Sequence, residues 1–301
     1  METQNAVRSA DGARIGYRTY GSGPGLVVVH GAMQSSASQR DLAELLATTG
    51  LAVHLLERRG RGLSDPYPSS FSTAVEVADL AAVLGATGSR MAFGISSGAL
   101  IVARAAVSLG SLERIALFEP PLVIGDRRRL GRIRDHAAAL DRGDVAGSMV
   151  IAMRAGEMGP SLMRAVPTPL MRAMTARMLA ADTRKAHEPG EATMAELAPA
   201  IREDFAILAE QADRLDEFAA IRATTLVIDG TKTRPYLHAA VEAMAATVPG
   251  ARRVSIPGVD HGATQNRDQW GKPDLVAPVL ADFFAAPAPV EAANRAALMG
   301  P

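Results

Sequence analysis

Cysteine is absent from the 301 residues of this chain, which excludes a thiol nucleophile, disulfide bonds and thiolate metal sites. A net charge is absent too, because 32 basic residues balance 32 acidic ones, so the overall charge attracts neither nucleic acid nor an anionic membrane. The sequence also lacks an apolar run of about 18 residues and, near its start, the apolar segment of a signal peptide. These absences predict a soluble, cytoplasmic protein with no nucleic-acid or membrane partner.

Apolar residues are plentiful and make up 48% of the sequence, enough for a sizeable core in one large α/β domain or two small ones. A local excess of charge lies between Asp126 and Asp135, in a cluster made of Arg127, Arg128, Arg129, Arg132 and Arg134. Because acids flank the cluster, we interpret it as a solvated helix face, with a phosphate-binding patch as the alternative. For the charged loop pattern at residues 57–64, an ion-pair network is favoured over contact with a substrate.

The pentapeptide Gly94-Ile95-Ser96-Ser97-Gly98 has the pattern G-x-S-x-G, with strand-like residues before it and helix-like residues after it. In that context the pattern predicts a nucleophile elbow, a tight turn that presents the Ser96 hydroxyl above the edge of a sheet. The two glycines would avoid collisions with the neighbouring strand and the helix start. The backbone N–H of Ser97 would point at an oxyanion formed nearby. An incidental glycine-rich turn is the alternative, which the flanking residues disfavour.

A second motif follows residues 26–29, an apolar run typical of a strand that is buried on both faces of a parallel sheet. The run ends in His30-Gly31-Ala32-Met33. Gly31 would allow the backbone to turn so that the N–H of Ala32 completes an oxyanion hole over Ser96. For His30 a hydrogen-bonded structural role is favoured over proton transfer, because it precedes the turn.

Further polar residues follow strand patterns later in the chain. Glu119 comes directly after residues 115–118, and the two prolines behind it restrict the backbone, so it is placed to orient another group. Asp229 lies near the end of another strand pattern. His261 follows a strand pattern by a short loop and precedes Gly262, a setting that suits an exposed, mobile imidazole.

Residues 123–220 show no strand pattern and are rich in Ala, Arg, Leu and Met, which predicts four or five helices. The segment holds eight of the 13 methionines. Methionine adapts to varied shapes, so we expect Met149 and Met153, together with Met33, to line an apolar pocket. Ordinary helix packing is the alternative for each of them.

The alternating strands and helices, the elbow, the upstream His-Gly loop and the late histidine together resemble the α/β-hydrolase superfamily over residues 5–285. The resemblance implies an α/β fold, with a mostly parallel eight-stranded sheet flanked by helices. Residues 1–122 and 221–301 would form the core, and residues 123–220 an inserted helical cap. By position, the roles that the resemblance implies are nucleophile for Ser96, general base for His261 and oxyanion donors for the amides of Ala32 and Ser97.

The acid departs from the usual pattern of the superfamily. Most members place an aspartate three residues after the glycine that ends the seventh strand, and that position, counted from Gly230, is Thr233 here. Glu119 follows the sixth strand, where zearalenone lactonases and haloalkane dehalogenases place their acid. Because the sixth strand would lie beside the nucleophile strand, Glu119 is the predicted triad acid, and Asp229 is the alternative acid.

The implied activity is that of a serine hydrolase which cleaves a carboxylic ester or lactone of a hydrophobic small molecule through an acyl-enzyme. No cofactor or metal is expected. A hydrolase of C–C bonds or a cofactor-free perhydrolase would use the same three residues. A ligand-sensing receptor of the same fold, or an inactive binding module, is the alternative outside enzymes. The sequence leaves a homodimer open.

Overall fold

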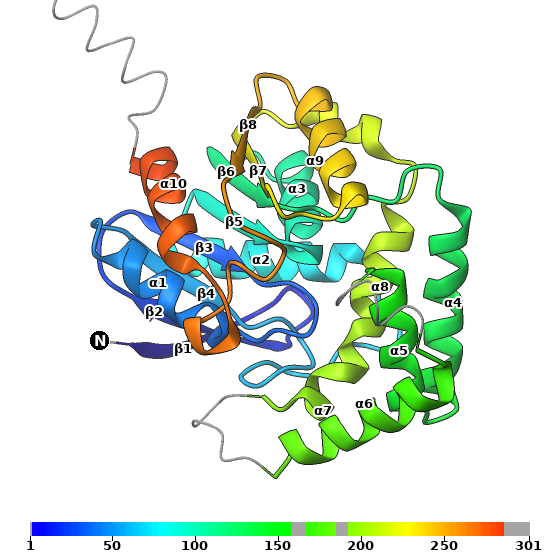
Figure 1. Ribbon diagram of the computed structural model, residues 1–301. Helices are drawn as coiled ribbons and strands as arrows, with labels where there is room; N and C mark the ends of the chain where they lie inside the picture. Colours follow the sequence, from blue (N-terminus) through cyan, green and yellow to red (C-terminus); the bar gives the residue numbers. More distant parts are fainter. Residues whose placement is uncertain (1, 158–165, 185–191, 286–301) are drawn as a thin grey trace, which may run out of the picture.

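The computed structural model describes residues 2–157, 166–184 and 192–285, and an eight-stranded sheet runs through its centre (Figure 1). The strand order is β1-β2-β4-β3-β5-β6-β7-β8. Strand β2 is antiparallel to β1 and β4, whereas all strands from β4 to β8 run parallel. This confirms the predicted sheet. The strands are β1 Thr3–Arg8, β2 Arg14–Tyr20, β3 Gly25–Val29, β4 Ala52–Leu56, β5 Met91–Ile95, β6 Arg114–Phe118, β7 Thr224–Gly230 and β8 Arg252–Ile256.

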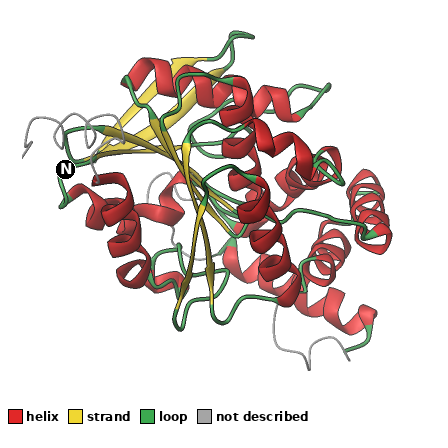
Figure 2. Ribbon diagram, turned by 90° about the horizontal axis from the view of Figure 1, so that it is seen from above, coloured by secondary structure: helices red, strands yellow, loops and turns green. Residues whose placement is uncertain are grey.

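Helices cover both faces of the sheet, as the view from above makes clear (Figure 2). Helices α1 and α10 pack on one face, and α2, α3 and α9 pack on the other. Their bounds are α1 Arg40–Ala47, α2 Thr73–Thr87, α3 Ser97–Ser108, α9 Pro235–Thr247 and α10 Pro273–Ala285. None of the helices in the described ranges is both long enough and apolar enough to cross a membrane.

Strand β3 lies between two apolar layers. Val27 and Val29 pack with α2 and α3, whereas Leu26 and Val28 pack with α1 and α10, because successive side chains of a strand point to opposite faces. None of the four is more than 2% exposed. Burial of one such side chain contributes about 1.5–3 kcal/mol, so the continuous apolar run holds this strand in the middle of the sheet.

A separate group of helices lies between β6 and β7 in the sequence and stands beside the sheet, in green in Figure 1. No described residue between 123 and 220 belongs to a strand. The helices are α4 Arg127–Asp141, α5 Val145–Ala155, α6 Thr168–Asp182, α7 Met194–Leu197 and α8 Ile201–Glu210, with short 3-10 turns at Ala198–Ala200 and Leu215–Ala220.

Buried ion pairs fasten α8 to the loop that follows β4. Asp204 of α8 accepts hydrogen bonds from Arg58 Nη1 at 2.5 Å and from Arg61 Nη2 at 2.7 Å. Arg58 also donates from Nε and Nη2 to Glu76 of α2. These four side chains, which we call the Arg58–Asp204 network, are at most 2% exposed. The loop at residues 57–64 therefore forms the ion-pair network that the sequence favoured.

The network keeps its central carboxylate ionised. Burial raises the pKa of the Asp204 carboxyl, but the guanidinium groups of Arg58 and Arg61 outweigh burial and lower the pKa from 3.8 to about 2. When one partner of a buried ion pair is removed, the other charge stays in a poorly solvated place, at a cost of about 3–5 kcal/mol.

We expect Asp204→Asn to lower the free energy of unfolding by about 3–5 kcal/mol, because Arg58 then retains its ion pair with Glu76 while the ion pair of Arg61 with Asp204 is lost. Urea unfolding at pH 7 measures the change. The matched control is Asp141→Asn, which removes an exposed ion pair with Arg202 and should cost less than about 1 kcal/mol. Equal, small losses of unfolding free energy in both variants would contradict the view that the ion pairs of Asp204 stabilise the fold.

The lowered pKa of Asp204 predicts that part of the free energy of unfolding is lost in acid. Its folded-state pKa lies below its unfolded value, so its contribution is complete above about pH 3.8 and is lost as the pH falls towards about 2. The stability difference between wild type and Asp204→Asn should therefore shrink across this window. Unfolding curves at pH 5, 4, 3 and 2 measure this difference. A difference that does not change with pH would contradict an ionised Asp204 carboxylate in the folded protein.

Candidate active site

The turn between β5 and α3 carries Ser96, whose backbone has φ 53° and ψ −123°. This positive φ is unusual for a residue other than glycine. The glycines on either side permit the turn. A Cβ on Gly98 would lie 2.2 Å from the carbonyl oxygen of Val29, and a Cβ on Gly94 would lie 2.5 Å from the Cα of Ala99. The strand–turn–helix context that the sequence predicted is therefore present, with space for hydrogen alone at both positions.

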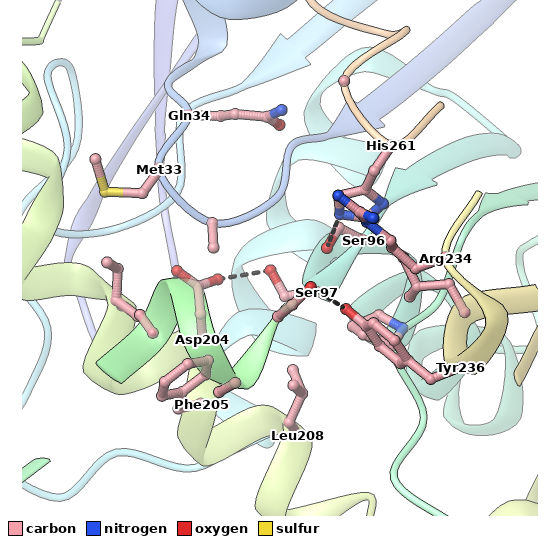
Figure 3. Close-up of a pocket in the computed structure, with 18 of the residues that line it drawn as sticks. Met33, Gln34, Ser96, Ser97, Asp204, Phe205, Leu208, Arg234, Tyr236 and His261 are labelled. Carbon is pink, nitrogen blue, oxygen red and sulfur yellow. Dashed lines mark hydrogen bonds between the residues drawn. The ribbon is translucent and has the colours of Figure 1, made fainter. Parts of the chain in front are cut away.

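Ser96 is the first member of a hydrogen-bonded series, and Figure 3 shows its contact with His261. Its Oγ lies 3.1 Å from Nε2 of His261, and Nδ1 of His261 lies 2.6 Å from Oε2 of Glu119. Because Ile95 of β5 pairs with Phe118 of β6, Ser96 and Glu119 leave the sheet at the same level. The loop after β8 brings His261 over them. The structure thus brings together the serine, histidine and glutamate that were singled out in the sequence.

Asp229, the alternative acid, is not part of this series. It accepts a hydrogen bond from Arg253 Nη2 at 2.9 Å, and its Oδ2 lies 2.7 Å from Nδ1 of His238 on α9. Asp229 still lies inside β7, so the strand directs its side chain to one face of the sheet. Glu119 lies one residue beyond β6 and has φ 46°, which lets its side chain turn towards His261.

Ala32 and Ser97, whose backbone amides are the predicted oxyanion donors, both line the cavity above Ser96. Within the described ranges, no hydrogen bond is donated by either amide. The loop that carries Ala32 is held by Gln34, whose Oε1 accepts from Gly31 N at 2.9 Å. A Cβ on Gly31 would lie 2.9 Å from the Cβ of Ser96, so glycine allows the loop to approach the serine closely. The two predicted oxyanion donors are therefore near the serine and available to a ligand.

The cavity has a volume of about 490 Å³ and lies between Ser96 and the helices between β6 and β7. Its apolar side comes from these helices and includes Ile133, Ala152, Ala155, Ile201, Phe205 and Leu208. Its polar side includes His261, Lys232 and Arg234 from the loops after β7 and β8. A bound molecule would therefore meet an apolar surface on one side and the Ser96 hydroxyl at the base.

Of the three methionines expected in the pocket, Met33 lines the cavity, and Met149 and Met153 are not among the described residues that do. Met149 lies one helical turn from Ala152 and is buried against Leu179 and Ile201. Met153 follows Ala152 by one position, about 100° around the helix. The pocket expectation is therefore wrong for these two, and helix packing, the alternative, describes Met149.

Two further residues that line the cavity, Arg129 and Tyr236, were not assigned to it from the sequence. Arg129 was taken as part of a solvated helix face, but it is 9% exposed, and its guanidinium carbon lies 3.7 Å from the ring centroid of Tyr236. Burial raises the pKa of Tyr236, so its hydroxyl stays protonated and donates to Gly156 O at 3.2 Å. Ile133, four residues after Arg129, is apolar and lies on the same helix face. That spacing was the signal that could have separated Arg129 from its exposed neighbours.

His30 directly follows β3 and is buried, and its Nε2 lies 3.6 Å from Oε1 of the buried Glu57. Its Nδ1 lies 2.9 Å from Gly31 O, and its Nε2 accepts from Arg58 N at 3.3 Å. Burial lowers the pKa of His30, which favours the neutral ring that this pair of bonds requires. These contacts agree with the structural role favoured for His30.

Known proteins provide an independent comparison. The model of the Alpha/beta hydrolase family matches residues 26–287. An α/β hydrolase from Sphaerobacter thermophilus shares 31% identity with a TM-score of 0.73, over 93% of this chain and 100% of that one. A thermophilic esterase from Thermogutta terrifontis shares 19% identity with a TM-score of 0.67, over 94% of this chain and 98% of its own.

An enol-lactonase from Burkholderia xenovorans also shares 19% identity, with a TM-score of 0.64, over 94% of this chain and 100% of its own. At this identity the esterase and the lactonase show the fold alone. No curated protein matches the chain. The family model covers most of the residues, and the Sphaerobacter hydrolase is similar along nearly the whole length. The chain therefore belongs to the α/β hydrolase family.

Proposed function

We propose that this chain is a serine hydrolase that cleaves a carboxylic ester or lactone of a hydrophobic small molecule through an acyl-enzyme. The observation that carries the proposal is the series from Ser96 Oγ through His261 to Glu119, with contacts of 3.1 and 2.6 Å. A base within hydrogen-bond reach of a serine, itself oriented by a carboxylate, is the arrangement that activates a weak hydroxyl nucleophile.

In the proposed reaction, His261 Nε2 takes the proton of Ser96 as Oγ attacks the carbonyl carbon. The carbonyl oxygen becomes an oxyanion and accepts hydrogen bonds from the amides of Ala32 and Ser97. His261 then gives the proton to the leaving oxygen, and an acyl group remains on Ser96. A water molecule then attacks this acyl group and gives a proton to His261, which passes it to the departing Ser96 Oγ as the acid is released. Glu119 orients the ring and stabilises its charged form.

The cavity supports the substrate class. Its apolar side would accommodate an acyl chain or ring, while the reacting carbonyl lies near Ser96. On this proposal residues 123–220 act as a cap, and their side chains select the substrate. The Thermogutta esterase and the Burkholderia enol-lactonase, both of the same fold, agree with an ester or a lactone as the bond that is cleaved.

Fluorophosphonate labelling tests the nucleophile. The reagent should attach to the peptide that contains Ser96, because this hydroxyl lies 3.1 Å from Nε2 of His261, and mass spectrometry of the digest locates it. Ser96→Ala should abolish both labelling and turnover of fluorogenic esters. A label on Ser97, or an active enzyme that takes no label, would contradict the role of Ser96. A burst without turnover would favour the ligand-sensing receptor.

Two matched substitutions test the acid. Glu119→Gln preserves the shape of the side chain but favours the wrong tautomer of His261, and such a change in a serine protease costs roughly ten-thousandfold in kcat. Asp229→Asn should retain most of the activity, because Asp229 bonds Arg253 and His238 instead. Steady-state kinetics on one ester compares them. The reverse ranking would assign the role to Asp229.

A panel of esters and lactones tests the pocket. The catalytic efficiency kcat/KM should rise from acetyl to longer acyl esters as more apolar surface is buried. Ala152→Phe fills part of the apolar side and should reduce kcat/KM for the longer esters by about tenfold or more, with little effect on the acetyl ester. Ala173→Phe, on the exposed face of α6, is the control. An unchanged ranking in Ala152→Phe would show that this surface does not select the substrate.

A further inference from the structure

The carboxylate of Glu119 is held at both of its oxygens. Oε2 faces His261 Nδ1 at 2.6 Å. Oε1 accepts a hydrogen bond from the Thr233 hydroxyl and a longer one, at 3.3 Å, from Gly230 N. Glu119 is fully buried, so these protein groups replace the water that would solvate the carboxylate at a surface.

The hydrogen bonds of Thr233 direct its hydroxyl proton at Glu119. The hydroxyl oxygen accepts from Gly230 N at 2.9 Å, and a hydroxyl has a single proton to donate. With Gly230 as its donor, Thr233 is left to donate to Oε1. A backbone bond from Thr233 N to Gly230 O, at 3.1 Å, closes the turn that carries the hydroxyl.

This turn is docked on the loop that carries His261. Lys232 N donates to Val259 O at 2.9 Å, and a Cβ on Gly230 would lie 2.1 Å from the same oxygen. Thr233 is therefore placed by the histidine loop itself while it holds the glutamate. Thr233 contacts Glu119 from a turn that is itself bonded to the loop of His261.

We propose that Thr233 is a positioning residue for the reaction, an inference that rests on the proposed function. Its hydroxyl fixes Oε1 so that Oε2 faces Nδ1 of His261, and it stabilises the ionised carboxylate in a place without solvent. A hydrogen bond to a carboxylate favours the charged form. Without the hydroxyl, the buried carboxylate would hold a proton more readily and could rotate away from the ring.

The test is Thr233→Val, which removes the hydroxyl at nearly constant volume. The lost bond to a charged group should lower kcat by roughly ten- to hundredfold, with KM little changed. The acidic limb of the kcat/KM profile should move to higher pH, because the pair of Glu119 and His261 then holds its proton more strongly. Thr233→Ser restores the donor and should restore both the rate and the profile.

Several other ionisable groups near Glu119 could also affect the pH dependence of kcat/KM. Those around the Glu119 carboxylate and the turn are His261, Asp260, Lys232, Arg234, Tyr236 and Asp229. Neither Thr233→Val nor Thr233→Ser replaces any of them. A shift in the first variant that the second one reverses therefore reports the hydroxyl.

A matched control comes from the same turn. Thr231→Val removes a hydroxyl that accepts from Gly258 N at 2.9 Å, a bond between the same two loops that does not reach Glu119. This variant should keep the wild-type kcat and pH profile. Circular dichroism shows whether each variant is folded. If Thr233→Val does not fold, Thr233→Ala is given the same measurements.

A spectroscopic readout needs no substrate. The His261 Nδ1 proton, bonded to Glu119, should give a low-field proton NMR signal that His261→Ala lacks. Thr233→Val should move or broaden this signal, while Thr233→Ser and Thr231→Val preserve it. A folded Thr233→Val with unchanged signal, kcat and profile would overturn the inference. If the signal responds but the wild type hydrolyses no ester or lactone, the positioning role stands and the proposed function fails.

Discussion

The tight turn at Ser96 is the constraint from which the geometry of the site follows. A residue with a side chain is held there at φ 53°, a conformation that costs on the order of 1–3 kcal/mol and persists only when its surroundings enforce it. The surroundings here are β5, between two other parallel strands, and α3, which is buried along most of its length. This packing places Ser96 and Ser97 at the cavity, and the glycine at position 31 lets its loop approach Ser96.

A buried layer of charge links this turn to the helices that cover it. The Ser97 hydroxyl donates to Asp204 Oδ1 at 2.6 Å and accepts from Arg58 Nη1 at 3.2 Å, and Figure 3 shows the bond between Ser97 and Asp204. Ser97, which lines the cavity, is thus bonded through its side chain to α8. Buried ion pairs add little stability compared with apolar packing, but their separation is costly. The Arg58–Asp204 network therefore opposes any displacement of α8 from the sheet.

The direction of the side chain determines which partners Glu119 and Asp229 have. Phe118 pairs with Ile228, so Glu119 and Asp229 occupy neighbouring positions at the same level of the sheet. The two residues differ in the path of the backbone around them. Asp229 continues within a strand and is directed towards α9, whereas Glu119 has left its strand and turns to the histidine loop. Two carboxylates at one sheet edge thus have unrelated partners.

The sequence by itself determined the parts that depend on local pattern. Apolar runs predict the parallel strands, glycines spaced around a serine predict the elbow, and the strand ends indicate where Glu119 and His261 emerge. Only the tertiary structure decided which side chains of the helical segment reach the cavity, since one step along a helix rotates a side chain by about 100°. That rotation separates Ala152 from Met153. Burial of Arg129, the pairing of Asp204 with Arg58 and the bond from Thr233 to Glu119 likewise join residues far apart in the chain, and no local pattern records such contacts.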